Sequence, residues 1–125
     1  MGQIHVSKLS ADDYRPLYDD PPWPGRIDES TVEGELNGLI HWIRETGSDG
    51  RLLKVGLFTQ DPATFPLTFP GDETILVLEG EVTIELVDTG EVVDLKQGDI
   101  ASFPKGARST WTVKSPYKEF FVLSG

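Results

Sequence analysis

Residues 73–111 have the sequence ETILVLEGEVTIELVDTGEVVDLKQGDIASFPKGARSTW, in which short apolar runs alternate with turns that contain glycine. The turns are Glu79-Gly80, Asp88-Thr89-Gly90, Gly98-Asp99 and Pro104-Lys105-Gly106. Apolar runs of this length between glycine turns predict antiparallel strands joined by hairpins. This order of strands and turns is typical of a small β-barrel with a central pocket.

The pattern continues on both sides of this stretch. Strands are predicted at residues 39–43, 52–58, 66–71, 73–79, 81–87, 91–94, 99–103, 107–113 and 118–123, and a loop at residues 61–63. Strands that recur at such short intervals, separated by glycine or proline, indicate an antiparallel sandwich or barrel. The sequence therefore predicts an all-β domain of about eight to ten strands.

An N-terminal arm, residues 1–37, stands apart from the predicted barrel at residues 38–125. Its prolines lack a backbone donor and fix φ, so neither a helix nor a central strand can run through them. They are Pro16, Pro21, Pro22 and Pro24, and among them stand Tyr14, Tyr18 and Trp23. Because flexible linkers seldom carry three large aromatic residues, the arm is expected to pack on the barrel or on a partner subunit.

The composition limits the class of protein. A chain of 125 residues suits one domain. Its 21 acidic and 11 basic residues give a net charge of −10, which repels phosphate backbones and anionic lipid, so neither nucleic acid nor a membrane is expected as a partner. The absence of cysteine excludes disulfides and thiolate chemistry and suits the cytoplasm. The N-terminal residues have no apolar run, so no signal peptide is predicted.

Two segments are similar to the two sequence motifs of the cupin superfamily. Residues 73–80, ETILVLEG, match the end of the first motif, and residues 98–108, GDIASFPKGAR, match most of the second. With Thr110-Trp111 and Gly56-Leu57-Phe58, the chain resembles the small single-domain group named after the ureidoglycine aminohydrolase cupin domain. The resemblance implies an RmlC-like jelly-roll barrel that pairs through its sheets into a homodimer.

The histidines that hold the metal in that superfamily are missing. By the resemblance, two histidines would precede Glu73 and one would follow in the second motif. Depending on the spacing, the two upstream positions are Leu67 and Phe69, or Pro66 and Thr68. The downstream position is Ser109. None of these side chains supplies an imidazole, and one carboxylate is too few ligands for a transition metal. We therefore expect a metal-free cupin without a cofactor.

Glu73 is the first candidate for a functional side chain, because the resemblance implies that it points into the barrel. Burial without a partner would raise its pKa, and a nearby cation would lower it. Arg108 and Lys105 in the second motif are the expected cationic partners. Glu73 is then either a general acid/base, an anchor for a polar ligand, or a structural residue held in a salt bridge.

Three further residues are candidate ligand contacts: His41, Ser109 and Trp111. His41 would either line the barrel beside Glu73 or face solvent from its strand. Trp111 follows Ser109 by two residues, so strand alternation places both on the inward face. There Trp111 would either stack on a planar ligand or pack in the core, while Ser109 has no base in view that would make it a nucleophile.

Three functions are compatible with these residues. The first is a metal-free module that binds a small polar or aromatic metabolite in the barrel. The second is an enzyme of nitrogen (ureide) or carbohydrate metabolism that uses Glu73 as its acid/base, which rests on fold analogy. The third is a pocketless scaffold or oligomerisation barrel, marked by a cavity filled with Trp111, Phe103 and Phe58.

Overall fold

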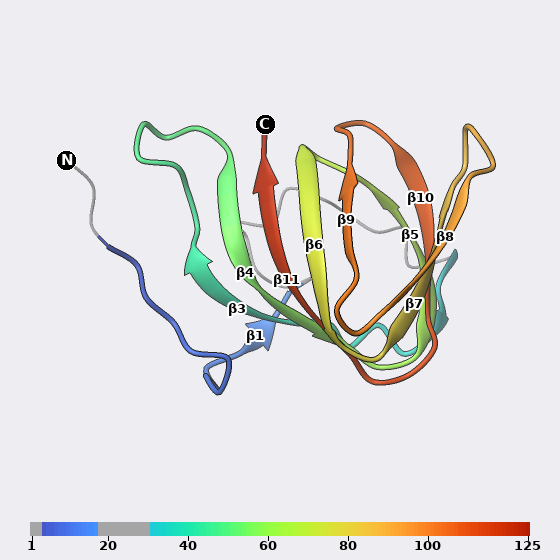
Figure 1. The fold of residues 1–125 in the computed structure, drawn as a ribbon, viewed down its shortest axis with the longest axis horizontal. Helices are drawn as coiled ribbons and strands as arrows, with labels where there is room; N and C mark the ends of the chain where they lie inside the picture. The colour runs from blue at the N-terminus through green and yellow to red at the C-terminus, as the bar shows by residue number, and fades with distance from the viewer. Residues whose placement is uncertain (1–3, 18–30) are drawn as a thin grey trace.

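A computed structural model of the protein describes residues 4–17 and 31–125, which form eleven strands in two antiparallel sheets (Figure 1). The first sheet has the order β1 (Arg15–Pro16), β3 (Leu39–Arg44), β4 (Leu53–Gln60), β11 (Tyr117–Ser124), β6 (Asp72–Glu79) and β9 (Ile100–Phe103). The second has the order β2 (Glu33–Gly34), β5 (Ala63–Thr68), β10 (Arg108–Val113), β7 (Glu81–Leu86) and β8 (Val92–Lys96).

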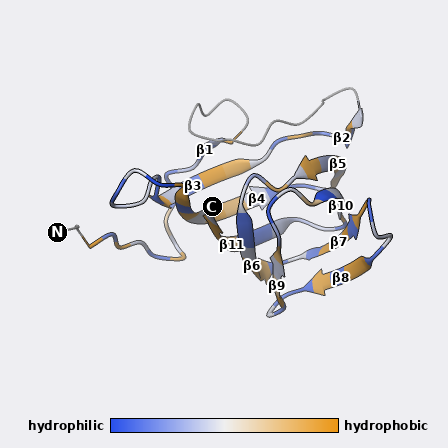
Figure 2. Ribbon diagram, turned by 90° about the horizontal axis from the view of Figure 1, so that it is seen from above, coloured by the Kyte–Doolittle hydropathy of each residue, from blue (hydrophilic) through white to orange (hydrophobic). Residues whose placement is uncertain are grey.

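The two sheets face each other, and the core lies between them (Figure 2). Between β4 and β7 the chain passes to the opposite sheet after every strand. It does so again from β8 to β9, from β9 to β10 and from β10 to β11. Alternate residues of β11 are buried, from Tyr117 to Leu123, and those of β10 from Ser109 to Val113. This alternation is expected of strands with one face on a core. The predicted all-β jelly roll is therefore confirmed.

The strand boundaries agree with the prediction except around β5. Residues 61–63 were expected to be a loop and 66–71 a strand, but the strand begins at Ala63 and ends at Thr68. Pro66 lies inside it, paired with Thr110 of β10. The proline is tolerated because β2 on the other side pairs only with Ala63 and Thr64, so no neighbouring strand needs its missing N–H.

Two short strands come from the chain before residue 38. β1 pairs with β3 at one edge of the first sheet, and β2 pairs with β5 at one edge of the second. These two-residue strands explain why there are more strands than predicted. These described residues thus pair with strands of the barrel, whereas Tyr18, Pro21, Pro22, Trp23 and Pro24 lie outside the described part. That the arm as a whole packs on the barrel or on a partner subunit stays a prediction. The division at residues 37 and 38 stays a prediction.

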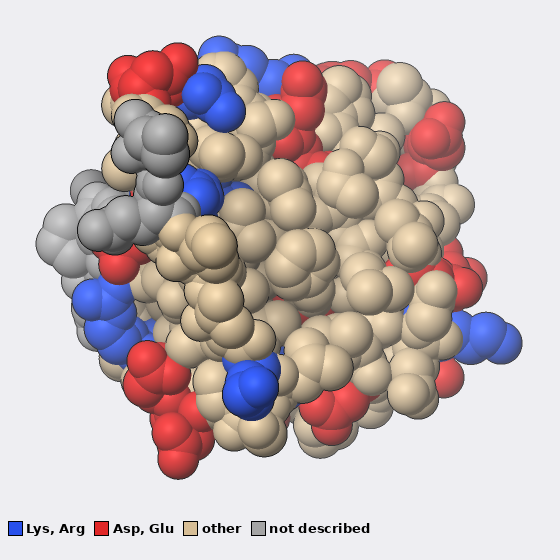
Figure 3. Space-filling model, turned by 60° about the vertical axis from the view of Figure 1, so that its left-hand side comes forward, with Lys and Arg blue, Asp and Glu red and all other residues tan. Residues whose placement is uncertain are grey.

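The surface has both charged and uncharged regions. Figure 3 shows, on one side of the molecule, a broad uncharged area with acidic and basic side chains around its rim. In the two described segments, no helix is long and apolar enough to cross a bilayer.

Gly80, in the turn between β6 and β7, is required by both conformation and space. Its φ is 81°, a region that disfavours side chains, and a Cβ there would lie 2.3 Å from the carbonyl oxygen of Pro116. Gly90 has a similar φ of 73°, but a Cβ at that position would meet nothing within 4 Å.

We predict that Gly80→Ala destabilises the protein more than Gly90→Ala does. Gly90→Ala introduces only the left-handed strain of roughly 1–2 kcal/mol, while Gly80→Ala adds an overlap that costs roughly 1–3 kcal/mol more. Urea denaturation of both variants measures the difference. Equal losses of stability would contradict the steric role of the Pro116 carbonyl.

Candidate functional site

Aromatic rings from both sheets wall the interior of the barrel. Phe69 stacks on Phe103 with ring centroids 4.7 Å apart, and Trp111 lies 6.3 Å from Phe69. Tyr117 meets both Trp111 and Phe58 edge-on, each at 6.4 Å. All five residues are buried. A polar group among these rings is therefore removed from water and pays a desolvation penalty.

Glu73 lies in this interior, as predicted. It occupies β6, is 3% exposed, and follows the inward register of Ile75 and Val77. Its Oε1 is buried and has no hydrogen-bond partner. Burial raises the pKa of Glu73 from its ordinary 4.5 to about 8. Glu73 therefore carries its proton at neutral pH and can donate a hydrogen bond.

A second buried carboxyl, Glu119, accompanies Glu73. It lies on the neighbouring strand β11, is 2% exposed, and accepts a hydrogen bond of 2.6 Å from the hydroxyl of Tyr117. Burial raises the pKa of Glu119, and the nearby Glu73 raises it further. The pKa of Tyr117 is raised as well, first by burial and then by Glu119. The three residues thus form a buried acid cluster, and no cation among the described residues lowers the pKa of any of them.

Sequence reasoning missed Glu119 and Tyr117, although a pattern could have revealed them. In the run from Tyr117 to Leu123, alternate positions are apolar except Glu119. A single acid in the inward register of a strand is a candidate for a buried functional group.

Ser109 and Trp111 share the inward face, as predicted from their spacing. The Ser109 hydroxyl donates to the carbonyl of Leu67 at 2.6 Å and accepts from the indole N–H of Trp111 at 3.1 Å. These bonds fix the Trp111 ring between Phe65 and Phe69. Ser109 thus positions the indole, and no base lies beside its hydroxyl. Direct ligand contact by either residue stays a prediction.

The prediction that Arg108 and Lys105 are the cationic partners of Glu73 was wrong. The side chain of Arg108 is 61% exposed and pairs with Asp88, because Arg108 begins β10 in the outward register. The Arg108 guanidinium therefore does not lie inside the barrel. The hydrogen bond and the negative charge of Asp88 raise the pKa of Arg108. Lys105 is exposed in the turn, where its backbone N–H donates to Asp72.

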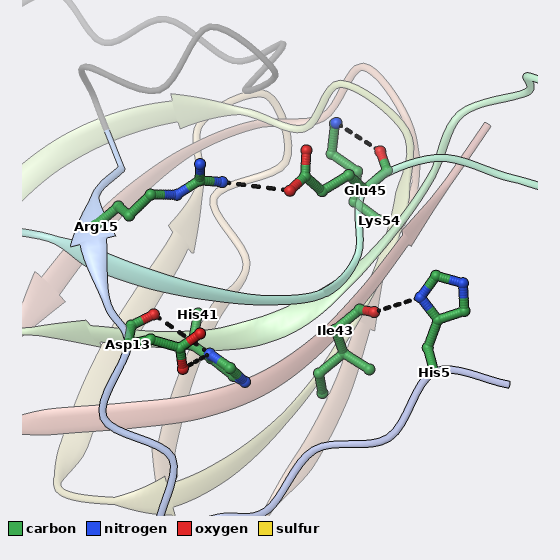
Figure 4. Close-up of polar contacts among 7 residues, drawn as sticks. All are labelled: His5, Asp13, Arg15, His41, Ile43, Glu45 and Lys54. Atoms are coloured by element: carbon green, nitrogen blue, oxygen red, sulfur yellow. Dashed lines mark hydrogen bonds and ion pairs between the residues drawn. The ribbon is translucent and has the colours of Figure 1, made fainter.

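His41 does not line the barrel beside Glu73, and it is not solvated either. Its neighbour Trp42 packs edge-on against the core residue Phe121, so His41 points from the opposite face of β3. There the N-terminal arm covers it, with Asp13 Oδ1 2.7 Å from His41 Nδ1 (Figure 4). His41 is therefore part of the arm contact and belongs to a separate site.

Two of the positions that the resemblance offers for metal-binding histidines hold buried apolar side chains. Leu67 and Phe69 are both buried, and the Phe69 ring stacks on Phe103 inside the barrel. Among residues 4–17 and 31–125, no three His, Cys, Asp or Glu side chains are grouped so that they could hold a metal ion. The donor set around Glu73 does not fit a metal, because Glu119 is its nearest acidic companion and no imidazole joins them.

The fold and the interior define a cupin, and the chain belongs to the EutQ-like cupin domain family, whose sequence profile matches residues 47–121. Cupin membership is thereby confirmed, and the ureidoglycine aminohydrolase group stays a resemblance. The crystal structure of a putative ethanolamine utilization protein Q from Salmonella typhimurium is similar at a TM-score of 0.61 and 28% identity, covering 78% of this chain and 82% of that one.

Longer curated relatives share the same region. Acetate kinase EutQ of Escherichia coli is 34% identical over 98 residues, which is 78% of this chain and 40% of the relative. Acetate kinase EutQ of Salmonella typhimurium is 39% identical over 83 residues, which is 66% of this chain and 34% of the relative. The chain thus spans well under half the length of these relatives.

The protonation of Glu73 predicts how stability depends on pH. Since its pKa rises from 4.5 to about 8 on folding, the folded protein keeps a proton that the unfolded chain loses. The contribution of Glu73 is therefore most favourable below pH 4.5 and falls as pH rises to about 8. We expect Glu73→Gln to gain stability over wild type between pH 5 and pH 9, by up to a few kcal/mol.

Urea denaturation at both pH values measures this gain. Glu81→Gln, an exposed change on β7, is the matched control and should show no such gain. A constant difference between Glu73→Gln and wild type across the range would contradict the raised pKa.

Proposed function

We propose that this chain is a metal-free cupin module that binds a small polar or aromatic metabolite inside the barrel. The observation that carries the proposal is the unpartnered Oε1 of Glu73, buried among aromatic rings. An unpaired buried polar atom costs roughly 1–3 kcal/mol. A ligand that hydrogen-bonds to it removes this cost on binding, and the rings of Trp111 and Phe69 offer apolar contact to the rest of the ligand.

The protonated state of Glu73 limits the chemical class of the ligand. A carboxylic acid kept neutral by an apolar site can donate a hydrogen bond to an acceptor oxygen. The ligand therefore carries a carbonyl or carboxylate oxygen and is small. The name of the longer relatives, acetate kinase, supports a short carboxylic acid as a ligand to test first.

A second candidate is catalysis by Glu73. A carboxyl with a pKa of about 8 is close to the value at which general acid/base groups work at neutral pH. The reaction would be one of nitrogen or carbohydrate metabolism. The third candidate, a filled scaffold barrel, is supported by the burial of Phe58, Phe103 and Trp111 in the core. The absence of cysteine supports a cytoplasmic location in each case.

Native mass spectrometry of the protein purified from cells tests the first candidate directly, because it reports subunits, metals and retained small molecules together. A thermal-shift titration with acetate should raise the unfolding midpoint of wild type and of Glu81→Gln. Glu73→Leu, which removes the donor while filling its volume, should abolish the shift. If acetate does not shift the unfolding midpoint of wild type and no molecule is retained, the filled barrel is the better description.

Glu73→Gln separates binding from catalysis. An amide keeps a donor at the same place, so binding is expected to survive. Turnover of any substrate through acid/base chemistry would fall by roughly 10²–10⁴-fold.

We also propose that the protein is a homodimer that pairs through the outer face of the first sheet. One cross-strand row of that face is apolar over four strands, Leu57, Phe120, Leu76 and Ile100. Leu57 is buried, but Phe120 and Leu76 are only half-buried and Ile100 is 68% exposed. A second copy would cover the exposed part of this row, as apolar patches on sheets are typically covered.

Ile100→Lys should therefore convert the dimer to a monomer without loss of fold, since the side chain lies outside the core. Val92→Lys is the control, because Val92 is similarly exposed at 54% but lies on β8 of the other sheet. Light scattering coupled to size exclusion measures the mass. A monomeric wild type, or a dimer that tolerates Ile100→Lys, would contradict the interface.

A further inference from the structure

The N-terminal arm brings Ser7 and Asp13 onto opposite nitrogens of His41. The Ser7 hydroxyl is hydrogen-bonded to His41 Nε2. On the other side of the ring, Asp13 Oδ1 lies 2.7 Å from His41 Nδ1, and the Asp13 carbonyl oxygen lies 3.4 Å from the same nitrogen (Figure 4). We propose that these residues form a nucleophilic triad, in which Ser7 attacks, His41 is the base, and Asp13 orients the imidazole.

The hydrogen-bond partners determine which nitrogen carries the proton. His41 Nδ1 faces only acceptors, both from Asp13, so Nδ1 holds the hydrogen of the neutral ring. Nε2 then presents its lone pair, and Ser7 donates its hydroxyl hydrogen to it. A serine hydroxyl bonded to an oriented imidazole is the arrangement that activates an otherwise weak nucleophile.

The surroundings hold the imidazole in place. The His41 side chain is 8% exposed, since Tyr14 lies over it with ring centroids 5.8 Å apart and Leu57 is its buried cross-strand neighbour. Ser7 itself is only half-buried, so a substrate can reach it. The Asp13 side chain is 80% exposed, and water screens its charge. Asp13 therefore orients the ring more than it stabilises the imidazolium.

Backbone donors stand next to the nucleophile. A turn follows Ser7 and is closed by the hydrogen bond from Ala11 N–H to the Lys8 carbonyl. The ammonium of Lys118 holds the Leu9 carbonyl at 3.0 Å and anchors this turn to the sheet. The N–H groups of Lys8 and Leu9 bond to none of the described residues. An N–H directly after a nucleophilic serine can stabilise a tetrahedral oxyanion.

The chemistry is acyl transfer from a small ester. The Ser7 oxygen bonds to the acyl carbon while His41 Nε2 takes its proton, and the C–O bond to the leaving alcohol breaks as Nε2 returns that proton to the alcohol. Water then attacks the acyl-serine through the same base, which releases the carboxylic acid and restores the hydroxyl. The acyl chain is apolar, because the buried Leu57, the cross-strand neighbour of His41, places an apolar side chain beside the imidazole.

A fluorophosphonate probe tests the triad on the full chain in its native oligomeric state. Peptide mass spectrometry should find the probe on Ser7 of wild type and no probe in Ser7→Ala. Ser10→Ala removes an exposed hydroxyl from the same arm and should be labelled at Ser7 like wild type. Both changes lie outside the barrel core, so both variants should keep the cooperative unfolding transition of wild type.

Two more variants test the roles of the partners. His41→Asn should slow labelling by roughly 10²–10⁴-fold. Asp13→Asn keeps an acceptor for the imidazole N–H, so the arm should stay in place. This variant should slow labelling less than His41→Asn does. Hydrolysis of p-nitrophenyl acetate should follow the same order. Absence of probe on Ser7 of wild type would overturn the triad, and so would labelling of Ser7 at an equal rate in wild type and His41→Asn.

Discussion

The interior of this protein is organised around the burial of two carboxyl groups whose pKa no cation in the described part of the chain lowers. Glu73 and Glu119 are 3% and 2% exposed on neighbouring strands. Burial disfavours the charged form of both carboxyls, and the charge of Glu73 would repel that of Glu119, so the pKa of each group is raised. Tyr117 satisfies one of them through its hydroxyl, while Glu73 retains an unpartnered oxygen. That asymmetry makes Glu73 the polar group that a ligand would complete.

The aromatic residues that line the interior include residues at positions where the resemblance implies metal-binding histidines. Of the positions that the resemblance offers for metal-binding histidines, Leu67 and Phe69 are buried, and Phe69 stacks on Phe103. Ser109 uses its hydroxyl to hold the indole of Trp111. The side chains that would surround a metal thus pack against one another, and the low dielectric that they create is what raises the pKa of Glu73.

The fold could be predicted from the sequence because glycine turns and apolar alternation are local signals. The inward positions of Ser109 and Trp111 also followed, since strand alternation places residues two apart on one face. The inward position of Glu73 followed from the resemblance to the first cupin motif. The partners of these residues did not follow. Arg108 was expected to face Glu73, but it begins β10 in the outward register, where Asp88 is available. Pairing across a barrel depends on register between distant strands, which a single sequence does not specify.

The face of His41 was undetermined for a related reason. The consecutive residues Ile40 and His41 of β3 are both buried, one on each face of the strand, so burial does not tell the two faces apart. The core contacts of its neighbours Ile40 and Trp42 establish that His41 points away from the barrel. The consequence is a division of chemistry between the two faces of one sheet. Glu73 and Glu119 lie inside the barrel, among aromatic rings. The His41 imidazole lies on the outer face, where Ser7 and Asp13 of the arm contact it. Because the sheet separates them, changes to either group test one proposal without disturbing the other.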